Sequence, residues 1–440
     1  MQLLPWRDPF SVALALRDEP GLVLLESGAG FGPRSGLRSG LRSGLRSGLR
    51  SFLSVRPQEI AGSGLEQLDS LPDGLWAGWL SYDLGREIER LPALTRDDRG
   101  LPSMALGRYA SWLEFDHARS ELRACGDGPA LHRLLAAVHA AGDAAPSHIE
   151  PAEWASSLPR ASYEQAVRDA IDYIRAGDIF QVNLSQRLSA EWSGDPFALY
   201  ARVREVACSP FMGLVRLGGA DIVSASPELF LRRSGRVIET RPIKGTRPRG
   251  RNAREDAALA AQLRSSDKDR AENVMIVDLA RNDLGRVCEY GSVRAERLYE
   301  VEPHAGVHQL VSTVTGELRD RVGVGDLVRA AFPPGSVTGA PKIRAMEIID
   351  ELEPVRRGPY CGSLVWIEPG GGLSMSVAIR TLVASAGVLD LHAGGAIVAD
   401  SDPHAEWRES MHKAAPLLRA AGGELPAGLR LDGRMTAGAR

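Results

Sequence analysis

The chain has 440 residues, of which 44% are hydrophobic and 25% are charged, the usual composition of a globular protein. Its 53 basic and 56 acidic residues give a formal net charge of -3, so we expect no nucleic-acid partner, which would require a clustered basic surplus. No apolar run reaches the roughly 18 residues of a membrane span, and the N-terminus lacks the pattern of a secretory signal, so we expect no membrane association.

The first region of the chain covers residues 1–125. Its apolar run GLVLLES (21–27) predicts a buried strand, and GLWAGWLSYD (74–83) predicts a strand followed by a turn. Between them, RSGL repeats over residues 34–51, which predicts a solvated basic loop because each glycine lowers helix propensity. Residues 126–160 are rich in Ala, Gly, Pro and Ser around one apolar helix at 131–141, and we interpret them as a linker region.

Residues 161–420 form the longest region, in which helical and strand patterns alternate. Helices are expected at 162–176, 253–264, 268–281, 341–351 and 403–420. Strands are expected at 179–192, 362–368, 374–384 and 388–399, and residues 222–245 are expected to form two strands joined by a Ser-Gly turn. The tail, 421–440, has turn composition and is expected to be disordered.

Cysteine and lysine are both used sparingly. The four cysteines, Cys125, Cys208, Cys288 and Cys361, form no CxxC pair, which fits a reducing cytoplasm and argues against a zinc site. Only four of the 53 basic residues are lysines: Lys244, Lys268, Lys342 and Lys413. An arginine-rich chain is expected to keep lysine where a compact ammonium, or an amine that can lose its proton, is needed.

Two residues are candidates for acid–base or nucleophilic chemistry. Lys244 ends an apolar strand before a Gly-Thr turn, where burial would lower its pKa and favour the free amine. Glu228 stands between proline and leucine in ASPELF, where burial would raise its pKa and suit a general acid. The alternatives are a lysine that snorkels to solvent and a glutamate on an edge strand.

Paired carboxylates suggest a metal site. Asp269 and Glu272 are three residues apart on one expected helix, and Glu406 and Glu409 are three apart on another. Two such helix faces across a cleft would suit Mg²⁺, which takes a few carboxylates together with water and substrate oxygens. The alternative is that both faces are solvated and paired with neighbouring arginines.

A third set of residues suggests an anionic substrate. Arg380 lies inside the apolar strand pattern SMSVAIRTLV, and a buried arginine needs an anionic partner. The glycine-containing turns around Gly245-Thr246 and Gly395-Ala396 offer backbone N–H groups that suit carboxylates. The turn at residues 332–342, FPPGSVTGAPK, stands just before a helix and is a further anion-facing helix start.

Seven segments together resemble the chorismate-utilising enzymes over residues 160–417. In chain order they are GDIFQVNLSQR, ASPELF, TRPIKGTRPRG, KDRAENVMIVDLARNDLGRV, HQLVSTVTGEL, FPPGSVTGAPKIRAMEIIDELEP and AGGAIVADSDPHAEWRESMHKA. The resemblance implies an α/β (α+β) fold in which a mostly antiparallel β-sandwich carries helices on its outside. It also implies that residues 161–420 are the chorismate-binding catalytic region.

Within this family the segment PIKGT resembles the members that aminate chorismate to 4-amino-4-deoxychorismate, on the way to 4-aminobenzoate and folate. Anthranilate-forming members usually read PIAGT, and anthranilate formation is the alternative. The resemblance implies that Lys244 adds to C2 of chorismate while Glu228 protonates the departing C4 hydroxyl. Ammonia then attacks C4 and expels the lysine. Gln181 stands where water-activating members have a lysine, which disfavours hydroxylation.

The resemblance also implies the binding residues. Glu272 and Glu409 correspond to Mg²⁺ ligands, supported by Asp269 and Glu406. Substrate contacts are implied for Gly245, Thr246, Thr338, Gly339, Tyr360, Arg380, Gly395, Ala396 and Lys413. LLES and SPFM resemble a pocket for L-tryptophan, with Ser27, Pro210, Phe211 and Met212 as its lining and plain core packing as the alternative.

Two positions depart from the family, and one segment is missing. Gln309 replaces a histidine before LVS, with His308 one residue earlier, and Ala396 replaces a third glycine. No cysteine stands in a GxCxG context, so ammonia is expected from a separate glutamine amidotransferase subunit.

Overall fold

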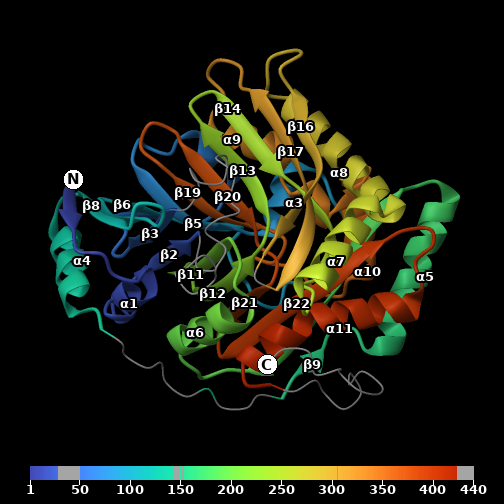
Figure 1. The fold of residues 1–440 in the computed structure, drawn as a ribbon, viewed down its shortest axis with the longest axis horizontal. Helices are drawn as coiled ribbons and strands as arrows, with labels where there is room; N and C mark the ends of the chain where they lie inside the picture. The colour runs from blue at the N-terminus through green and yellow to red at the C-terminus, as the bar shows by residue number, and fades with distance from the viewer. Residues whose placement is uncertain (28–49, 143–148, 150–152, 305, 424–440) are drawn as a thin grey trace.

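Two antiparallel β-sheets form the centre of the computed structural model (Figure 1). The structure describes residues 1–27, 50–142, 149, 153–304 and 306–423. Most of the RSGL repeat and the tail from residue 424 therefore lie outside the described residues.

Sheet A has twelve strands within the described ranges. Their spatial order is β1 (Gln2–Leu4), β8 (Glu121–Gly126), β7 (Ser111–Asp116), β3 (Arg50–Ser54), β2 (Val23–Glu26), β11 (Phe211–Leu217), β12 (Ala220–Ser226), β21 (Thr381–Ser385), β22 (Val388–Ile397), β10 (Gln181–Glu191) and β18 (Gly339–Ala340), with β9 (Ala155–Ser156) against β10. Sheet A thus combines strands from both ends of the chain.

Sheet B has ten strands in the part of the chain that the structure describes. Their order is β15 (Ile243–Pro248), β17 (Val307–Glu317), β14 (Val237–Arg241), β13 (Leu229–Ser234), β20 (Leu373–Val377), β19 (Ser363–Ile367), β5 (Leu75–Leu80), β6 (Met104–Tyr109) and β4 (Glu59–Ala61), with β16 (Arg294–Pro303) against β17.

Helices cover the outer faces of both sheets. Their bounds are α1 (Pro9–Leu14), α3 (Gly85–Ile88), α4 (Pro129–Ala140), α5 (Arg160–Ala176), α6 (Pro196–Val206), α7 (Ala253–Ser265), α8 (Asp267–Gly285), α9 (Val324–Ala331), α10 (Lys342–Leu352) and α11 (Pro403–Ala420), with short 3₁₀ turns at Leu65–Asp69, Tyr82–Leu84 and Gly335–Val337. Figure 1 shows α5, α6 and α11 beside sheet A, and α7 and α8 beside β17.

Three apolar clusters show why these layers hold together. One joins the sheets through residues such as Val215 of β11 and Trp79 of β5, which are fully buried. A second packs Trp407 of α11 and its neighbours on the outer face of sheet A. A third packs Leu284 of α8 with the outer face of sheet B, giving the helix–sheet–sheet–helix order of a covered sandwich. The expected fold class, an α/β (α+β) protein with an antiparallel sandwich and outer helices, is confirmed.

Two strand predictions were wrong in detail. The expected strand at 374–384 is two strands, β20 and β21, which belong to different sheets, so the chain crosses between the sheets at residues 378–380. The expected pair of strands at 222–245 is four, since the chain leaves β12 at Ser226, enters sheet B at Leu229 and bends again before β15. Both crossings carry candidate site residues.

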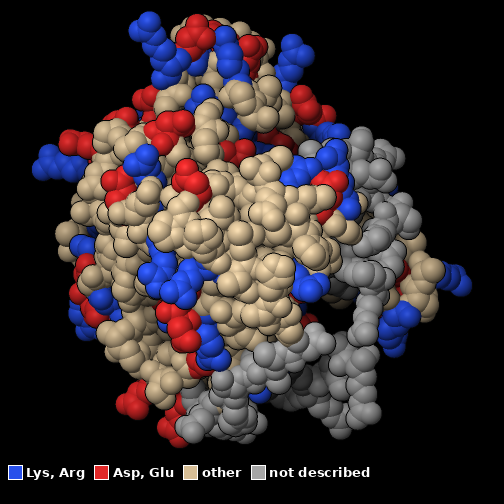
Figure 2. Space-filling model, turned by 90° about the vertical axis from the view of Figure 1, so that its left-hand side faces the viewer, with Lys and Arg blue, Asp and Glu red and all other residues tan. Residues whose placement is uncertain are grey.

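The described surface carries charges of both signs on the face seen in Figure 2. On the face drawn in Figure 2, acidic and basic side chains of the described residues are mixed around an uncharged centre. No helix in the described ranges is long and apolar enough to cross a membrane.

Candidate active site

A bulge in β15 presents Lys244. The pairing of β15 with β17 shifts by one residue between Ile243 and Thr246, so Lys244 and Gly245 stand opposite a single residue of β17. Gly245 has a φ of 85°, and a Cβ there would lie 2.9 Å from the side chain of Asp269, so the bulge requires glycine. The Lys244 Nζ donates to the carbonyl oxygen of Ser336 at 3.3 Å. Burial lowers the pKa of Lys244, and the carboxylates of Glu272 and Glu228 partly offset this effect.

Glu228 lies beside Lys244 at the crossing from β12 to β13. Its side chain is buried, its N–H donates to Ser226 Oγ at 3.2 Å, and its carbonyl accepts from the N–H of Val377 at 3.0 Å. Burial raises the pKa of Glu228 to about 7, although the Ser336 hydroxyl and the charge of Lys244 lower it. Ser336 therefore acts on both groups: its carbonyl accepts from the amine of Lys244, and its hydroxyl lowers the pKa of Glu228.

The first turn of α8 supplies two carboxylates. The hydroxyl of Ser266 caps the helix by accepting from the N–H of Asp269 at 3.3 Å. Asp269 also accepts from Arg247 at 2.8 Å, so this carboxylate already has a cationic partner. Burial raises the pKa of Glu272, which faces both Lys244 and Lys268.

The first half of α11 supplies two more carboxylates beside β22. Glu406 is buried and accepts from Ser401 Oγ at 2.7 Å. Glu409 is more exposed and pairs with Lys413 at 2.8 Å, which lowers the pKa of the Glu409 carboxyl. A Cβ on Gly395 would lie 3.2 Å from Glu406 Oε2, 3.6 Å from Lys413 Nζ and 3.8 Å from Glu409 Oε1, so these four residues meet at one point.

One carboxylate of each pair, Glu272 of α8 and Glu409 of α11, lies near the other and near Lys244. The charge of Glu409 raises the pKa of Glu272 and that of Lys244, so the ends of α8 and α11 lie within each other's electrostatic field. Among the described residues, no group of three His, Cys, Asp or Glu side chains stands close enough to hold a metal ion by itself. Any cation here would therefore take most of its ligands from water and substrate, as Mg²⁺ commonly does.

The remaining wall of the site comes from residues 335–340 and from Tyr360. Thr338 is fully buried, and its hydroxyl donates toward the carbonyls of Pro334 and Gly335. A Cβ on Gly339 would lie 2.2 Å from the carbonyl of Gln181, so only glycine permits this approach of β18 to β10. Tyr360 is buried and stacks on His392, with ring centroids 4.9 Å apart.

Arg380 lies at the crossing between β20 and β21, which corrects the prediction that it stands inside one strand. Its backbone φ is 51°, and its carbonyl accepts from the N–H of Ala225 at 3.0 Å. Burial lowers the pKa of its guanidinium, and no carboxylate within the described ranges forms an ion pair with it. A half-buried cation without an internal partner fits an anion that arrives from outside.

The segments predicted to line a tryptophan pocket are brought together. Strands β2 and β11 pair, with Glu26 opposite Met212, and Met212 is buried while Phe211 is partly exposed. Ser27 Oγ donates to the carbonyl of Arg50 on β3. Next to them the fully buried Glu26 accepts hydrogen bonds from Tyr200 and Arg204, which the sequence reasoning did not find.

Sequence reasoning also missed Ser336 and the burial of the Gln181 side chain. Ser336 lies two residues before the expected contact Thr338, and its own contact depends on the bulge that brings Lys244 to it. Gln181 is fully buried, and neither polar atom of its side chain has a partner among the described residues. Of the two departures, Gln309 is buried, with the neighbouring His308 bonded to Asp256 at 2.9 Å, and Ala396 is partly exposed on β22 opposite Asn183.

Comparisons with known proteins show what the chain is similar to. It is 43% identical over 342 residues to aminodeoxychorismate synthase component 1 of Escherichia coli K12, covering 78% of this chain and 76% of that protein. It is 45% identical over 369 residues to anthranilate synthase component 1 of Thermus thermophilus, covering 81% of this chain and 79% of the relative. Overall identity therefore does not separate these two activities.

The solved structure of anthranilate synthase component I from Streptococcus pneumoniae TIGR4 superimposes with a TM-score of 0.76 at 30% identity, over 84% of this chain and 92% of that one. The sequence pattern of chorismate binding enzymes matches residues 43–419. The resemblance inferred from the motifs is confirmed: the chain belongs to the family of chorismate binding enzymes.

Proposed function

We propose that this chain aminates chorismate at C4 to form 4-amino-4-deoxychorismate. The observation that carries the proposal is the pairing of Lys244 with Glu228 through Ser336. Burial lowers the pKa of Lys244, which favours the free amine, and raises the pKa of Glu228 to about 7, which suits a general acid near neutral pH. The relatives at 43–45% identity named aminodeoxychorismate synthase component 1 support the same activity.

The proposed reaction has two displacements. The Lys244 amine forms a bond to C2 of chorismate while the C4–O bond breaks, and Glu228 gives its proton to the departing hydroxyl, which leaves as water. Ammonia then forms a bond to C4 and the C2–N bond to lysine breaks. The Glu228 carboxylate takes the extra proton from the new ammonium, which restores the acid. An amine is required here because an arginine guanidinium does not lose its proton in proteins.

Arginine and backbone groups are proposed to hold the substrate carboxylates. Arg380 has no internal carboxylate partner among the described residues, and Lys413 and Gly395 lie together beside α11. Glu272 and Glu409, with Asp269 and Glu406 behind them, fit the oxygen ligands that Mg²⁺ takes. When bound, Mg²⁺ would neutralise a substrate carboxylate next to these acidic side chains.

Ammonia is proposed to come from a separate glutamine amidotransferase subunit, since the relatives are named as component 1 of their enzymes. The paired segments around Ser27 and Met212 are proposed to line a site for L-tryptophan. The four cysteines are all free, which supports a cytoplasmic location.

The test is incubation of the purified chain with chorismate, Mg²⁺ and ammonium at alkaline pH. We expect a product with the mass of aminodeoxychorismate that yields 4-aminobenzoate only after a lyase is added. Lys244→Ala is the matched control and should remove this product. Fluorescent anthranilate with pyruvate would contradict the proposal and would assign the chain to tryptophan synthesis.

A further inference from the structure

A buried ion pair behind the substrate wall has no part in the proposed chemistry. Glu353 ends α10, and Arg357 follows four residues later. Their side chains are only 3% and 1% exposed. Arg357 Nε and Nη2 donate to the two Glu353 carboxylate oxygens at 2.9 and 2.6 Å, so the pair is bidentate.

The pair also joins two pieces of backbone that border the site. Arg357 donates through Nη1 to the carbonyl of Val337 at 2.9 Å and through Nη2 to that of Asn183 at 2.6 Å. Val337 directly precedes Thr338, and Asn183 pairs with Ala396 across β10 and β22. The guanidinium thus fixes the spacing between the Thr338 turn and the β10–β22 ladder.

Glu353 completes this connection on its own side. Its Oε1 accepts from the N–H of Ser185 at 2.8 Å and from the Ser185 hydroxyl at 2.9 Å. Both members of the pair are therefore bound to β10, at positions two residues apart.

The same guanidinium holds the aromatic side of the wall. It lies 4.7 Å from the ring centroid of Tyr82 and 6.0 Å from that of Tyr360, within the range of cation–π contacts. Tyr360 in turn stacks on His392, whose pKa is lowered by burial and by the neighbouring arginines, so the imidazole is neutral.

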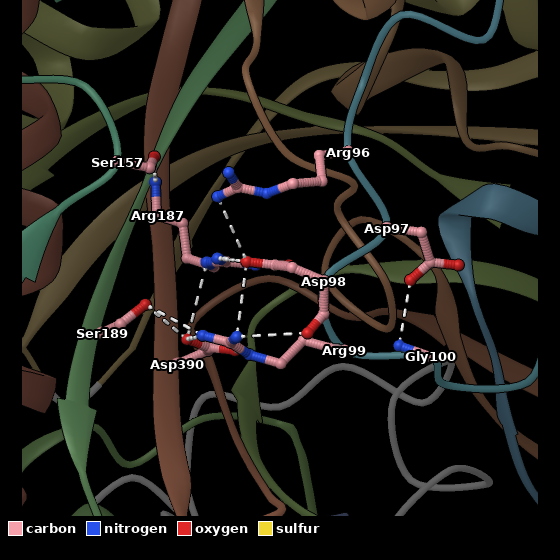
Figure 3. Close-up of polar contacts among 9 residues, drawn as sticks. All are labelled: Arg96, Asp97, Asp98, Arg99, Gly100, Ser157, Arg187, Ser189 and Asp390. Carbon is pink, nitrogen blue, oxygen red and sulfur yellow. Dashed lines mark hydrogen bonds and ion pairs between the residues drawn. The ribbon is translucent and has the colours of Figure 1, made fainter.

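Further along β10 and β22, a second cluster of charged residues continues this buried polar layer (Figure 3). Arg187 pairs with Asp98, and Arg99 pairs with Asp390 at 2.6 and 2.9 Å. These contacts attach the loop at residues 96–100 to the same two strands. The inner face of the β10–β22 ladder is thus polar and cross-linked where an ordinary sandwich has apolar side chains.

Such a pair is an inefficient source of stability. Two charges lose their hydration on burial, and well-packed apolar residues often serve as well. We propose that Arg357, held by Glu353, is a positioning residue that fixes the Thr338 turn and the Tyr360 ring in the geometry that binds chorismate. This inference rests on the proposed function for the identity of the substrate wall.

The test compares Arg357→Lys with Arg86→Lys. Arg86 is the control because it joins Asp350 of the same helix α10 to Asp83 and Thr95, and within the described residues it forms no hydrogen bond to the Thr338 turn or to Tyr360. Chorismate affinity is measured by equilibrium dialysis without ammonium, KM and kcat with ammonium, and the midpoint of thermal unfolding for each variant. Glu353→Gln replaces Arg357→Lys if the latter does not fold.

We expect Arg357→Lys to raise the chorismate Kd and KM at least about tenfold while kcat changes less than about threefold. Arg86→Lys should leave the chorismate Kd within about twofold of the wild-type value, even where it lowers the unfolding midpoint as much as Arg357→Lys does. Equal effects of both variants on Kd, an unchanged Kd in Arg357→Lys, or failure of both Arg357→Lys and Glu353→Gln to fold would overturn the proposal. Dialysis measures binding without turnover, so the two proposals can fail separately. If the wild type binds chorismate but does not aminate it, the proposed function is refuted and the positioning role of Arg357 is still tested by the Kd values.

Discussion

The buried acid Glu228 allows a test that does not depend on activity. Replacing it with glutamine keeps the shape of the side chain and removes its charge. The pKa of Glu228 is about 7 in the folded chain against an ordinary value of 4.5, because burial disfavours the carboxylate. The folded state therefore binds this proton more tightly than the unfolded state does. At low pH Glu228 is protonated in both the folded and the unfolded state. As the pH rises toward 7, the unfolded state gives up this proton first, so the free energy of unfolding falls.

The size of the effect follows from the shift of about 2.5 pKa units, each of which corresponds to about 1.36 kcal/mol. Glu228→Gln should therefore become more stable than the wild type by up to about 3 kcal/mol between pH 4.5 and pH 7, and the difference should level off above pH 7. This free-energy difference is not reduced for screening by solvent, because Glu228 is only 5% exposed.

The assay is urea denaturation of both proteins at pH 5, 6, 7 and 8. The same substitution at Glu205, which is exposed on α6, serves as the control for removal of one negative charge. The reasoning is refuted if the difference between wild type and Glu228→Gln does not grow with pH. At pH 7 the same variant should lose about 10²-fold or more in kcat, because it cannot give a proton to the C4 hydroxyl.

Other predictions address the remaining parts of the site. Lys244→Ala should abolish amination with added ammonium, and near-wild-type turnover would show that Lys244 is not the nucleophile. Glu409→Gln should weaken activity and shift the Mg²⁺ titration upward together; an unchanged titration would exclude Glu409 from the metal site. Gly245→Ala should lower stability by about 1–3 kcal/mol in urea denaturation, because a Cβ at φ 85° meets Asp269 at 2.9 Å. Arg380→Gln should raise KM for chorismate at least about tenfold with a smaller change in kcat, and an unchanged KM would contradict its contact with a carboxylate.

Much of the fold could be predicted because local patterns are strong. The helices α5, α7, α8, α10 and α11 lie within a few residues of their expected ranges, and three of them begin at a polar cap. The strand β22 was also expected at its observed place.

The crossings between the two sheets could not be predicted from the periodicity of apolar residues alone. The run 374–384 is rich in apolar residues and has no proline or glycine to break it, yet the chain changes sheets at Arg380, whose φ is 51°. Likewise the one-residue register shift that presents Lys244 depends on the pairing of β15 with β17, which no local pattern contains. The roles of Ser336 and Arg357 follow only from these long-range contacts.

The structure shows what each of the four lysines contacts. Three of the four lysines lie within ion-pair distance of a carboxylate: Lys268 of Glu272, Lys342 of Asp283 and Lys413 of Glu409. Among the described residues, Lys244 has no such partner, and its one hydrogen bond goes to a neutral carbonyl oxygen.

A permanent charge would be costly at that position, because burial already lowers the pKa of Lys244. Arginine would keep its charge there, whereas lysine can become a neutral amine next to the protonated Glu228. A chain that uses arginine for most of its positive charge thus retains lysine at the position where a proton must be lost. We therefore expect Lys244→Arg to fold and to stay inactive with added ammonium; an active Lys244→Arg enzyme would show that only the positive charge matters.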